Sequence, residues 1–234
     1  MQKIDINKLV RQNILDLKPY SSARDEFSGK EGVFLDANEN PFGELNRYPD
    51  PHQKELKRKL SEIKCVPAAN IFIGNGSDEV IDLTFRIFCN PAKDKALVFP
   101  PTYGMYEVSA EINEVGLIKV PLSSAFQIDS DALENRLNDE TLKLIFICSP
   151  NNPTGNIIEN IETVLQKFKG IVIVDEAYID FSNTVSFISK IGQYPNLIVM
   201  QTLSKCWALA AARVGMAYAD ERIISLFDKI KPPY

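Results

Sequence analysis

Short hydrophobic runs alternate along the chain with segments whose apolar side chains recur at helical spacing. An apolar run between turn residues is typical of a buried strand, and helical spacing is typical of a helix with one buried face. Strands are predicted at 33–35, 71–73, 96–99, 116–120, 142–148, 171–174, 197–200 and 214–219. Helices are predicted at 3–15, after Pro51, at 80–88, after 101–106, at 131–137, at 158–168 and at 222–229.

This alternation predicts an α/β fold with a mainly parallel sheet. Binding sites in such sheets form where the carboxyl ends of the strands meet, and the unusual turns of this chain follow predicted strands. The first 45 residues do not share the alternation. They are predicted to form a hydrogen-bond-rich loop at 36–43, preceded by an arm helix whose apolar side carries Ile6, Leu9, Val10 and Ile14.

Composition narrows the classes of function. With 234 residues, 45% of them hydrophobic, the chain can bury a substantial core. The formal net charge is −5 and no basic block occurs, so nucleic acid is a disfavoured partner. No apolar run is long enough to span a membrane, and residues 1–7 lack the apolar core of a signal peptide.

Cysteine and histidine usage argues against a metal centre. Cys65, Cys89, Cys148 and Cys206 show no CxxC spacing. That pattern fits reduced thiols in a cytoplasmic protein better than a disulfide framework or a zinc site. A single histidine, His52, leaves little basis for a histidine-ligated metal or a serine triad. We therefore expect a cytoplasmic protein without a metal site.

The stretch 201–215 carries the strongest candidate chemistry. Lys205 stands just beyond the end of a predicted buried strand, where a charged side chain needs a partner and a lysine can serve as a covalent anchor. Thr202, Ser204 and Arg213 add two hydroxyl groups and a guanidinium fork, which are groups that bind phosphate. Taken alone, this stretch fits a polar surface loop with an ordinary lysine better than an active site.

Two further turns offer complementary groups. The glycine turn 74–79, with Ser77 as its predicted N-cap, places backbone N–H groups of Ser77 and Asp78 at a helix N-terminus, which favours phosphate. Asp175 ends a predicted buried strand and needs a cationic partner, and Tyr178 follows at a spacing that reaches the same face. An ordinary capped helix and a metal-ligating aspartate remain alternatives for these features taken singly.

Read together, these groups indicate one pocket. A phosphate grip, a strand-end lysine and a partly buried aspartate suit an aromatic phosphate cofactor that carries a pyridine nitrogen. The turn 151–155 would add amide groups to the pocket, although by itself it could be a plain turn.

Segments 35–43, 48–51, 100–106, 149–155, 174–181 and 202–215, taken together, resemble a known family. They are similar to the fold-type I pyridoxal-phosphate aminotransferases, and within them to the class II histidinol-phosphate aminotransferases. Asn-Asn-Pro-Thr-Gly, Asp-Glu-Ala-Tyr and Thr-Leu-Ser-Lys, in this order and spacing, are specific for the superfamily and less so for the substrate. The resemblance implies a three-layer α/β/α large domain at 46–234, preceded by an N-terminal arm and substrate loop at 1–45.

The resemblance implies a role for each matching residue. Lys205 would hold pyridoxal 5'-phosphate covalently and, once a substrate amine displaces it, act as general base and acid. Asp175 would pair with the protonated pyridine nitrogen and keep the ring a strong electron sink. Tyr178 and Asn152 would bond the ring 3-oxygen, and Tyr103 would stack on the ring face.

The same resemblance implies the outer contacts of the pocket. Tyr48 resembles the residue that reaches the phosphate of a neighbouring subunit, which implies a homodimer. Tyr20 and Asn38 resemble substrate contacts. The phosphate itself would be held by the N–H groups of Ser77 and Asp78 and by Thr202, Ser204 and Arg213.

The implied reaction transfers an amino group between L-histidinol phosphate and 2-oxoglutarate, in histidine biosynthesis. A threonine-phosphate decarboxylase-like lyase, an aromatic-amino-acid aminotransferase and a non-catalytic fragment of the fold stay open as alternatives. Chains of the family continue beyond the part matched by 229–234 into a small C-terminal domain that supplies the arginine for the substrate carboxylate. We therefore expect these 234 residues to bind cofactor but to transaminate poorly alone.

Overall fold

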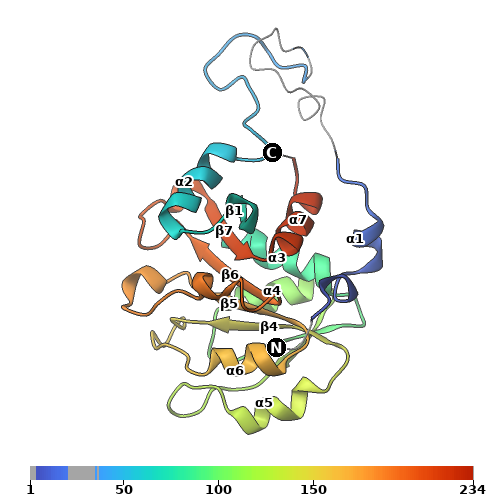
Figure 1. Ribbon diagram of the computed structural model, residues 1–234, viewed down its shortest axis with the longest axis vertical. Helices are drawn as coiled ribbons and strands as arrows, with labels where there is room; N and C mark the ends of the chain where they lie inside the picture. The colour runs from blue at the N-terminus through green and yellow to red at the C-terminus, as the bar shows by residue number, and fades with distance from the viewer. Residues whose placement is uncertain (1–3, 21–34, 36, 234) are drawn as a thin grey trace.

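A seven-stranded sheet forms the centre of the computed structural model, in which residues 4–20, 35 and 37–233 are described (Figure 1). The strand order is β1-β7-β6-β5-β4-β2-β3. Strand β7 runs antiparallel to both of its neighbours, and every other adjacent pair is parallel. The predicted mainly parallel sheet is thus confirmed. The strands are β1 (Ile71–Asn75), β2 (Lys95–Val98), β3 (Gly116–Lys119), β4 (Leu142–Cys148), β5 (Ile171–Asp175), β6 (Leu197–Thr202) and β7 (Val214–Ala219).

Helices cover both faces of the sheet, which gives three layers. The alternation of side chains along β4 shows why, because Phe146 and Cys148 belong to one hydrophobic core while Ile145 and Ile147 belong to the other. The first core receives α1 (Gln12–Asp16), α3 (Ser77–Phe88), α4 (Met105–Ile112) and α7 (Glu221–Ile230). The second core receives α2 (Lys54–Lys64), α5 (Ser130–Leu137) and α6 (Ile161–Lys167).

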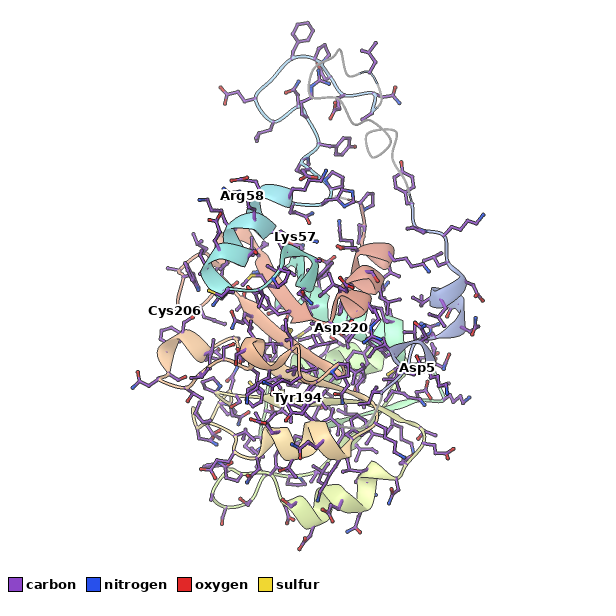
Figure 2. The ribbon with its side chains drawn as sticks, viewed as in Figure 1. Asp5, Lys57, Arg58, Tyr194, Cys206 and Asp220 are labelled. Carbon is purple, nitrogen blue, oxygen red and sulfur yellow. The ribbon has the colours of Figure 1, made fainter. Side chains whose placement is uncertain are left out.

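Acidic side chains fix several element ends. Asp220, labelled in Figure 2, accepts a hydrogen bond from the backbone N–H of Arg222 at 3.0 Å and caps α7. Asp5 caps the 3-10 turn Ile6–Lys8 in the same way. These carboxylates satisfy N–H groups that have no partner within the helix and complement its dipole. Lys57 in α2 lies 3.3 Å from the Asp228 carboxylate in α7, which joins the helices next to β1 and β7.

The arm is broken, unlike the single helix predicted at 3–15. It consists of a 3-10 turn and the short α1, separated at Arg11. Arg11 is extended, and its backbone N–H donates to the carbonyl oxygen of Ile87 at 2.9 Å, outside the arm. The predicted buried side is nevertheless confirmed for Ile6, Val10 and Ile14.

Several predicted boundaries were also wrong. The helix expected to open at Pro51 begins at Lys54, whose backbone N–H donates to the Asp50 carboxylate at 2.8 Å. Ser77 is the first residue of α3 rather than its N-cap, since Gly76 takes that position with a φ of 82°. The helix expected at 158–168 is limited to α6.

The strand predicted at 33–35 can be compared with the structure only at Leu35, because its other two residues lie outside the described ones. Leu35 is exposed and lies in no strand. None of the helices in the described ranges has the length and apolarity needed to cross a membrane. The same residues contain no cluster of three or more His, Cys, Asp or Glu side chains able to hold a metal ion.

Candidate active site

A cavity of about 210 Å³ lies at the carboxyl ends of the central strands. β4, β5 and β6 contribute Cys148, Asp175 and Thr202 to it, and α3 begins at its wall. This is the edge at which parallel α/β sheets form their sites. All the predicted cofactor contacts except Tyr48 meet here. The lining residues are Ser77, Asp78, Tyr103, Cys148, Asn152, Asp175, Ala177, Tyr178, Thr202, Ser204, Lys205, Ala210 and Arg213.

Two glycines bring the start of α3 against its neighbours. A Cβ added to Gly215 would lie 2.2 Å from the backbone nitrogen of Ser77, and one added to Gly76 would lie 2.4 Å from Nη2 of Arg213. Only residues without a side chain permit these approaches. The first N–H groups of a helix have no partner within it and attract anions. The guanidinium of Arg213 therefore lies beside the helix end best suited to a phosphate.

The turn after β6 adds hydroxyl groups to this end of the cavity. Thr202 Oγ1 accepts the backbone N–H of Ser204 at 3.1 Å, and the two hydroxyl oxygens lie 3.0 Å apart. Arg213 follows the 3-10 turn Ala210–Ala212 with a φ of 53°, and its Nη1 donates to the carbonyl oxygen of Ala210 at 3.1 Å. The side chains of Thr202, Ser204 and Arg213 are thereby held on one wall.

Asp175 lines the same cavity and is buried, with 3% of its surface exposed. Its Oδ2 accepts the hydroxyl of Tyr106 at 2.6 Å and its Oδ1 accepts the backbone N–H of Ala177 at 3.0 Å. Burial raises the pKa of Asp175 to about 6, against these two hydrogen bonds, which lower it. Both hydrogen-bonding partners are neutral, so a cation in the cavity would stabilise this carboxylate.

This pKa predicts how stability depends on pH in the ligand-free protein. The folded-state pKa near 6 exceeds the ordinary 3.8, so the unfolded chain releases this proton first as the pH rises. Asp175 therefore lowers stability progressively between those values, by up to about 3 kcal/mol above them. The Asp175→Asn variant has no carboxyl group at this position, so its stability does not fall for this reason. The difference in unfolding free energy between variant and wild type should rise across the window in urea titrations, whereas a difference that is constant with pH would contradict the assignment.

Lys205 lies in the turn after β6 and is exposed. Its Nζ is 5.5 Å from the centre of the Tyr178 ring, and it forms no ion pair with the described residues. An amine of this kind, at the mouth of a cavity that also holds a buried carboxylate, can attack a carbonyl group. Lys205 and Tyr178 thus lie on the same side of the site.

The remaining walls come from two loops that hold each other. Asn151 Nδ2 donates to the carbonyl oxygen of Pro101 at 2.9 Å and to Thr154 Oγ1 at 2.7 Å. This pair of bonds fixes the turn that carries Asn152 against the loop that carries Tyr103. Tyr103 donates its hydroxyl to Asp78 at 3.1 Å; burial, and then the charge of Asp78, raise the pKa of Tyr103 to about 12. Its phenol therefore stays protonated at neutral pH.

Three predicted site residues do not line the cavity. Tyr48 is 49% exposed and lies in the loop before α2, which projects beyond the body of the protein in Figure 1. Asn38 belongs to the same projecting loop. Tyr20 is 73% exposed and borders a separate hollow beside Lys18 and Lys229.

Some residues that matter to the geometry were not predicted from the sequence. Tyr106 and Cys148 contact the buried end of the site, and Gly76 and Gly215 shape its phosphate end. Tyr106 stands three residues after Tyr103, where a helix was predicted to open, and this spacing was a signal that could have linked the two. No local pattern marks Gly215, because its role depends on which strand pairs with β1.

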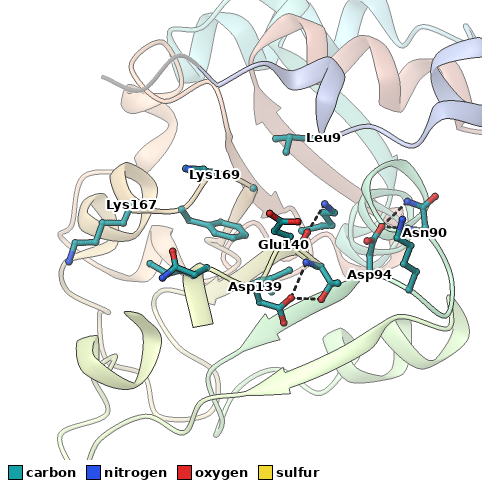
Figure 3. Close-up of a pocket in the computed structure, with 15 residues that line it drawn as sticks. Leu9, Asn90, Asp94, Asp139, Glu140, Lys167 and Lys169 are labelled. Carbon is teal, nitrogen blue, oxygen red and sulfur yellow. Dashed lines mark hydrogen bonds between the residues drawn. The ribbon is translucent and has the colours of Figure 1, made fainter. Parts of the chain in front are cut away.

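A wider hollow of about 690 Å³ lies at the opposite, amino-terminal edge of β4 and β5 (Figure 3). Its polar groups bond mainly to one another. Asp94 accepts the side-chain amide of Asn90 at 2.8 Å, and Lys143 donates to the carbonyl oxygen of Glu140 at 2.8 Å. Size alone does not identify a site, and the smaller cavity is the one where reactive groups converge.

Comparisons with known proteins agree with this geometry. The family model for aminotransferase class I and II matches residues 26–234. A histidinol-phosphate aminotransferase of Cytophaga hutchinsonii is 55% identical over 98% of the chain and 68% of its own length. The crystal structure of the histidinol-phosphate aminotransferase from Clostridium acetobutylicum is 26% identical, with a TM-score of 0.72 over 81% of this chain and 57% of its own.

A second solved structure contains a bound ligand. The histidinol-phosphate aminotransferase from Sinorhizobium meliloti, in complex with pyridoxal-5'-phosphate, is 26% identical with a TM-score of 0.71. That match covers 80% of this chain and 52% of the other. The chain thus spans about half the length of the solved structures that it matches.

Proposed function

Because this chain belongs to the class I and II aminotransferase family, we propose that its cavity holds pyridoxal 5'-phosphate for an amino-transfer reaction. The proposed substrates are L-histidinol phosphate and 2-oxoglutarate, as part of histidine biosynthesis, in line with the name of the relative that is 55% identical. One observation carries the proposal: Lys205, the buried Asp175 and the start of α3 meet at a single cavity. That set provides an amine, an anion and an anion-binding helix end.

The residues present fit this cofactor. Gly76 and Gly215 let the start of α3 lie close to Arg213 and β7, and a helix start beside a guanidinium suits the phosphate group. Asp175 is a buried carboxylate without a cationic hydrogen-bond partner among the described residues, and this suits a protonated ring nitrogen. Lys205 offers an amine that forms no ion pair with the described residues.

When bound, the cofactor supplies an electron-accepting ring that stabilises negative charge at the amine-bearing carbon of the substrate. Lys205 is the residue proposed to hold it covalently. With Lys205 free of the cofactor, its Nζ would remove the proton from the amine-bearing carbon of the substrate. Asp175 contributes by staying anionic beside the ring nitrogen, and Tyr178 and Asn152 by bonding the ring oxygen.

The other groups bind and orient. Tyr103 would cover one face of the cofactor ring. The hydrogen bond to Asp78 holds the phenol of Tyr103 in position. The phosphate is assigned to the N–H groups of Ser77 and Asp78 and to the side chains of Thr202, Ser204 and Arg213. We assign Tyr20 and Asn38 to the substrate, outside the cavity itself.

We also propose a cytoplasmic homodimer in which residues 46–234 form the cofactor domain and 1–45 an arm. The exposed position of Tyr48 supports the dimer, because a side chain on a projecting loop can reach a neighbouring subunit. The burial of Ile6, Val10 and Ile14 supports an arm that begins on the body of its own chain.

The test is amino transfer with each product measured. Supplied with pyridoxal 5'-phosphate, L-histidinol phosphate and 2-oxoglutarate, these 234 residues should form glutamate and the ketone of the donor slowly but in equal amounts. Equal amounts are required because the amine lost by one substrate is gained by the other. L-threonine phosphate, tested separately, should release no carbon dioxide. Release of carbon dioxide from it, without glutamate formation from histidinol phosphate, would replace the aminotransferase proposal with a lyase.

A further inference from the structure

Tyr106 connects two parts of the site that the proposed roles leave separate. It is the second residue of α4, and its side chain is fully buried. Its ring stacks on Phe146 with centroids 4.9 Å apart and meets the edge of Tyr103 at 5.6 Å. Its hydroxyl donates to Asp175 Oδ2 at 2.6 Å. One side chain thus touches both the proposed ring-stacking residue and the proposed partner of the ring nitrogen.

The hydrogen bond acts mainly on the charged form of Asp175. A phenol donates more strongly to a carboxylate than to a neutral carboxylic acid, and a bond to the charged form favours ionisation. Burial, and then the charge of Asp175, raise the pKa of Tyr106 well above its usual value. Tyr106 therefore remains a donor across the working range of pH.

Other groups facing Asp175 do not replace this bond. Asp78, at the start of α3, opposes ionisation of Asp175, whereas Lys205, beyond β6, favours it. Cys148, from β4, stays a neutral thiol, since burial and the Asp175 charge raise its pKa to about 12. The hydroxyl of Tyr103 donates to Asp78 and not to Asp175. Within the described residues, Tyr106 is the one side chain that hydrogen-bonds Asp175.

We propose that Tyr106 is a positioning residue of this site, whose hydroxyl holds the Asp175 carboxylate charged and in one orientation for the cationic ring nitrogen of the cofactor. This inference rests on the proposed function, because it assigns Asp175 to that nitrogen. Tyr106 itself touches neither cofactor nor substrate under this proposal. It acts through Asp175, and its loss should be felt most where Asp175 is close to taking up a proton.

Tyr106→Phe tests the proposal, because it keeps the stacked ring and removes only the donor. Without the hydroxyl, Asp175 should take up a proton at a pH at least about one unit higher. With a shift of about one unit from a pKa near 6, cofactor affinity should fall about fivefold to tenfold at pH 6 and below, and return towards the wild-type value by about pH 8. The measurement is the dissociation constant of pyridoxal 5'-phosphate at each pH, as the ratio of variant to wild type.

Tyr218→Phe is the matched control. Tyr218 is also fully buried, on β7, but its hydroxyl forms no hydrogen bond with the described residues. The same chemical change there should leave the ratio close to one at every pH. A Tyr106→Phe ratio of one throughout, or a loss of equal size at every pH, would overturn the proposal, because a merely structural role loosens the site without regard to pH.

A second arm uses the cofactor-free protein. The difference in unfolding free energy between a protein with Asp175 and the same protein carrying Asp175→Asn gives the pH at which Asp175 titrates. This pH should be about one unit higher when both proteins also carry Tyr106→Phe. An unchanged midpoint in folded variant protein would also overturn the proposal. Failure of the proposed function looks different, because the wild type would then bind no cofactor at Lys205. A wild type that binds at Lys205 with a flat variant ratio would refute the role of Tyr106 alone.

Discussion

Replacing Lys205 with alanine will abolish covalent attachment of the cofactor and lower amino transfer by at least about 10³-fold. The expectation follows from position. Lys205 is an exposed amine at the mouth of the cavity, above the Tyr178 ring and free of ion pairs with the described residues. Among the described residues, no other lysine lines this cavity. The proton transfer at the substrate carbon therefore loses its base together with the anchor.

The measurement is the absorbance change on adding pyridoxal 5'-phosphate, followed by the rate of glutamate formation. Lys169→Ala is a suitable control, because Lys169 is an exposed lysine at the opposite edge of the sheet, beside the hollow of Figure 3. It should keep both signals. If the Lys205→Ala variant retained the absorbance change and the rate, the chemistry would be located elsewhere.

Replacing Gly215 with alanine will disrupt the phosphate end of the site. The added Cβ would lie 2.2 Å from Gly76 C and Ser77 N, which are backbone atoms that cannot rotate away. Either β7 or the start of α3 must shift, at a cost of at least about 2 kcal/mol in the free energy of unfolding. The shift displaces Ser77 from Arg213, so cofactor affinity should fall by at least about 100-fold as charge-assisted hydrogen bonds are lost.

Gly192→Ala separates this effect from the general cost of replacing a glycine. A Cβ at Gly192 would meet nothing within 4 Å, and its φ lies outside the left-handed region. Urea unfolding and cofactor titration should therefore show little change there. Equal behaviour of the two variants would refute the close approach of β7 to α3.

The sequence predicted the sheet and the site edge for a physical reason. The run 171–174 is apolar on both faces, as a strand covered by helices on both sides must be, and Asp175 ends it. A polar residue at such an end falls where α/β sheets place their sites. Thr202, the last residue of the neighbouring strand β6, and Lys205, just beyond it, follow from the same rule.

Other features depend on contacts between distant segments, which no local pattern encodes. Gly215 matters because β7 pairs with β1 and lies against the start of α3. Tyr106 matters because its hydroxyl reaches Asp175, 69 residues further along the chain. The arm helix was broken by one backbone hydrogen bond from Arg11 to Ile87, a partner that helical spacing cannot reveal.

The most direct measurement locates the covalent link between protein and cofactor. The protein is mixed with pyridoxal 5'-phosphate, the link is made permanent with borohydride, and the modified peptide is identified by mass spectrometry. The cofactor mass should appear on the peptide that contains Lys205, at one cofactor per chain. An excess of free phosphate should lower the amount of cofactor attached to this peptide. Modification spread over surface lysines, or concentrated on a lysine outside the cavity, would contradict the assignment of this cavity as the active site.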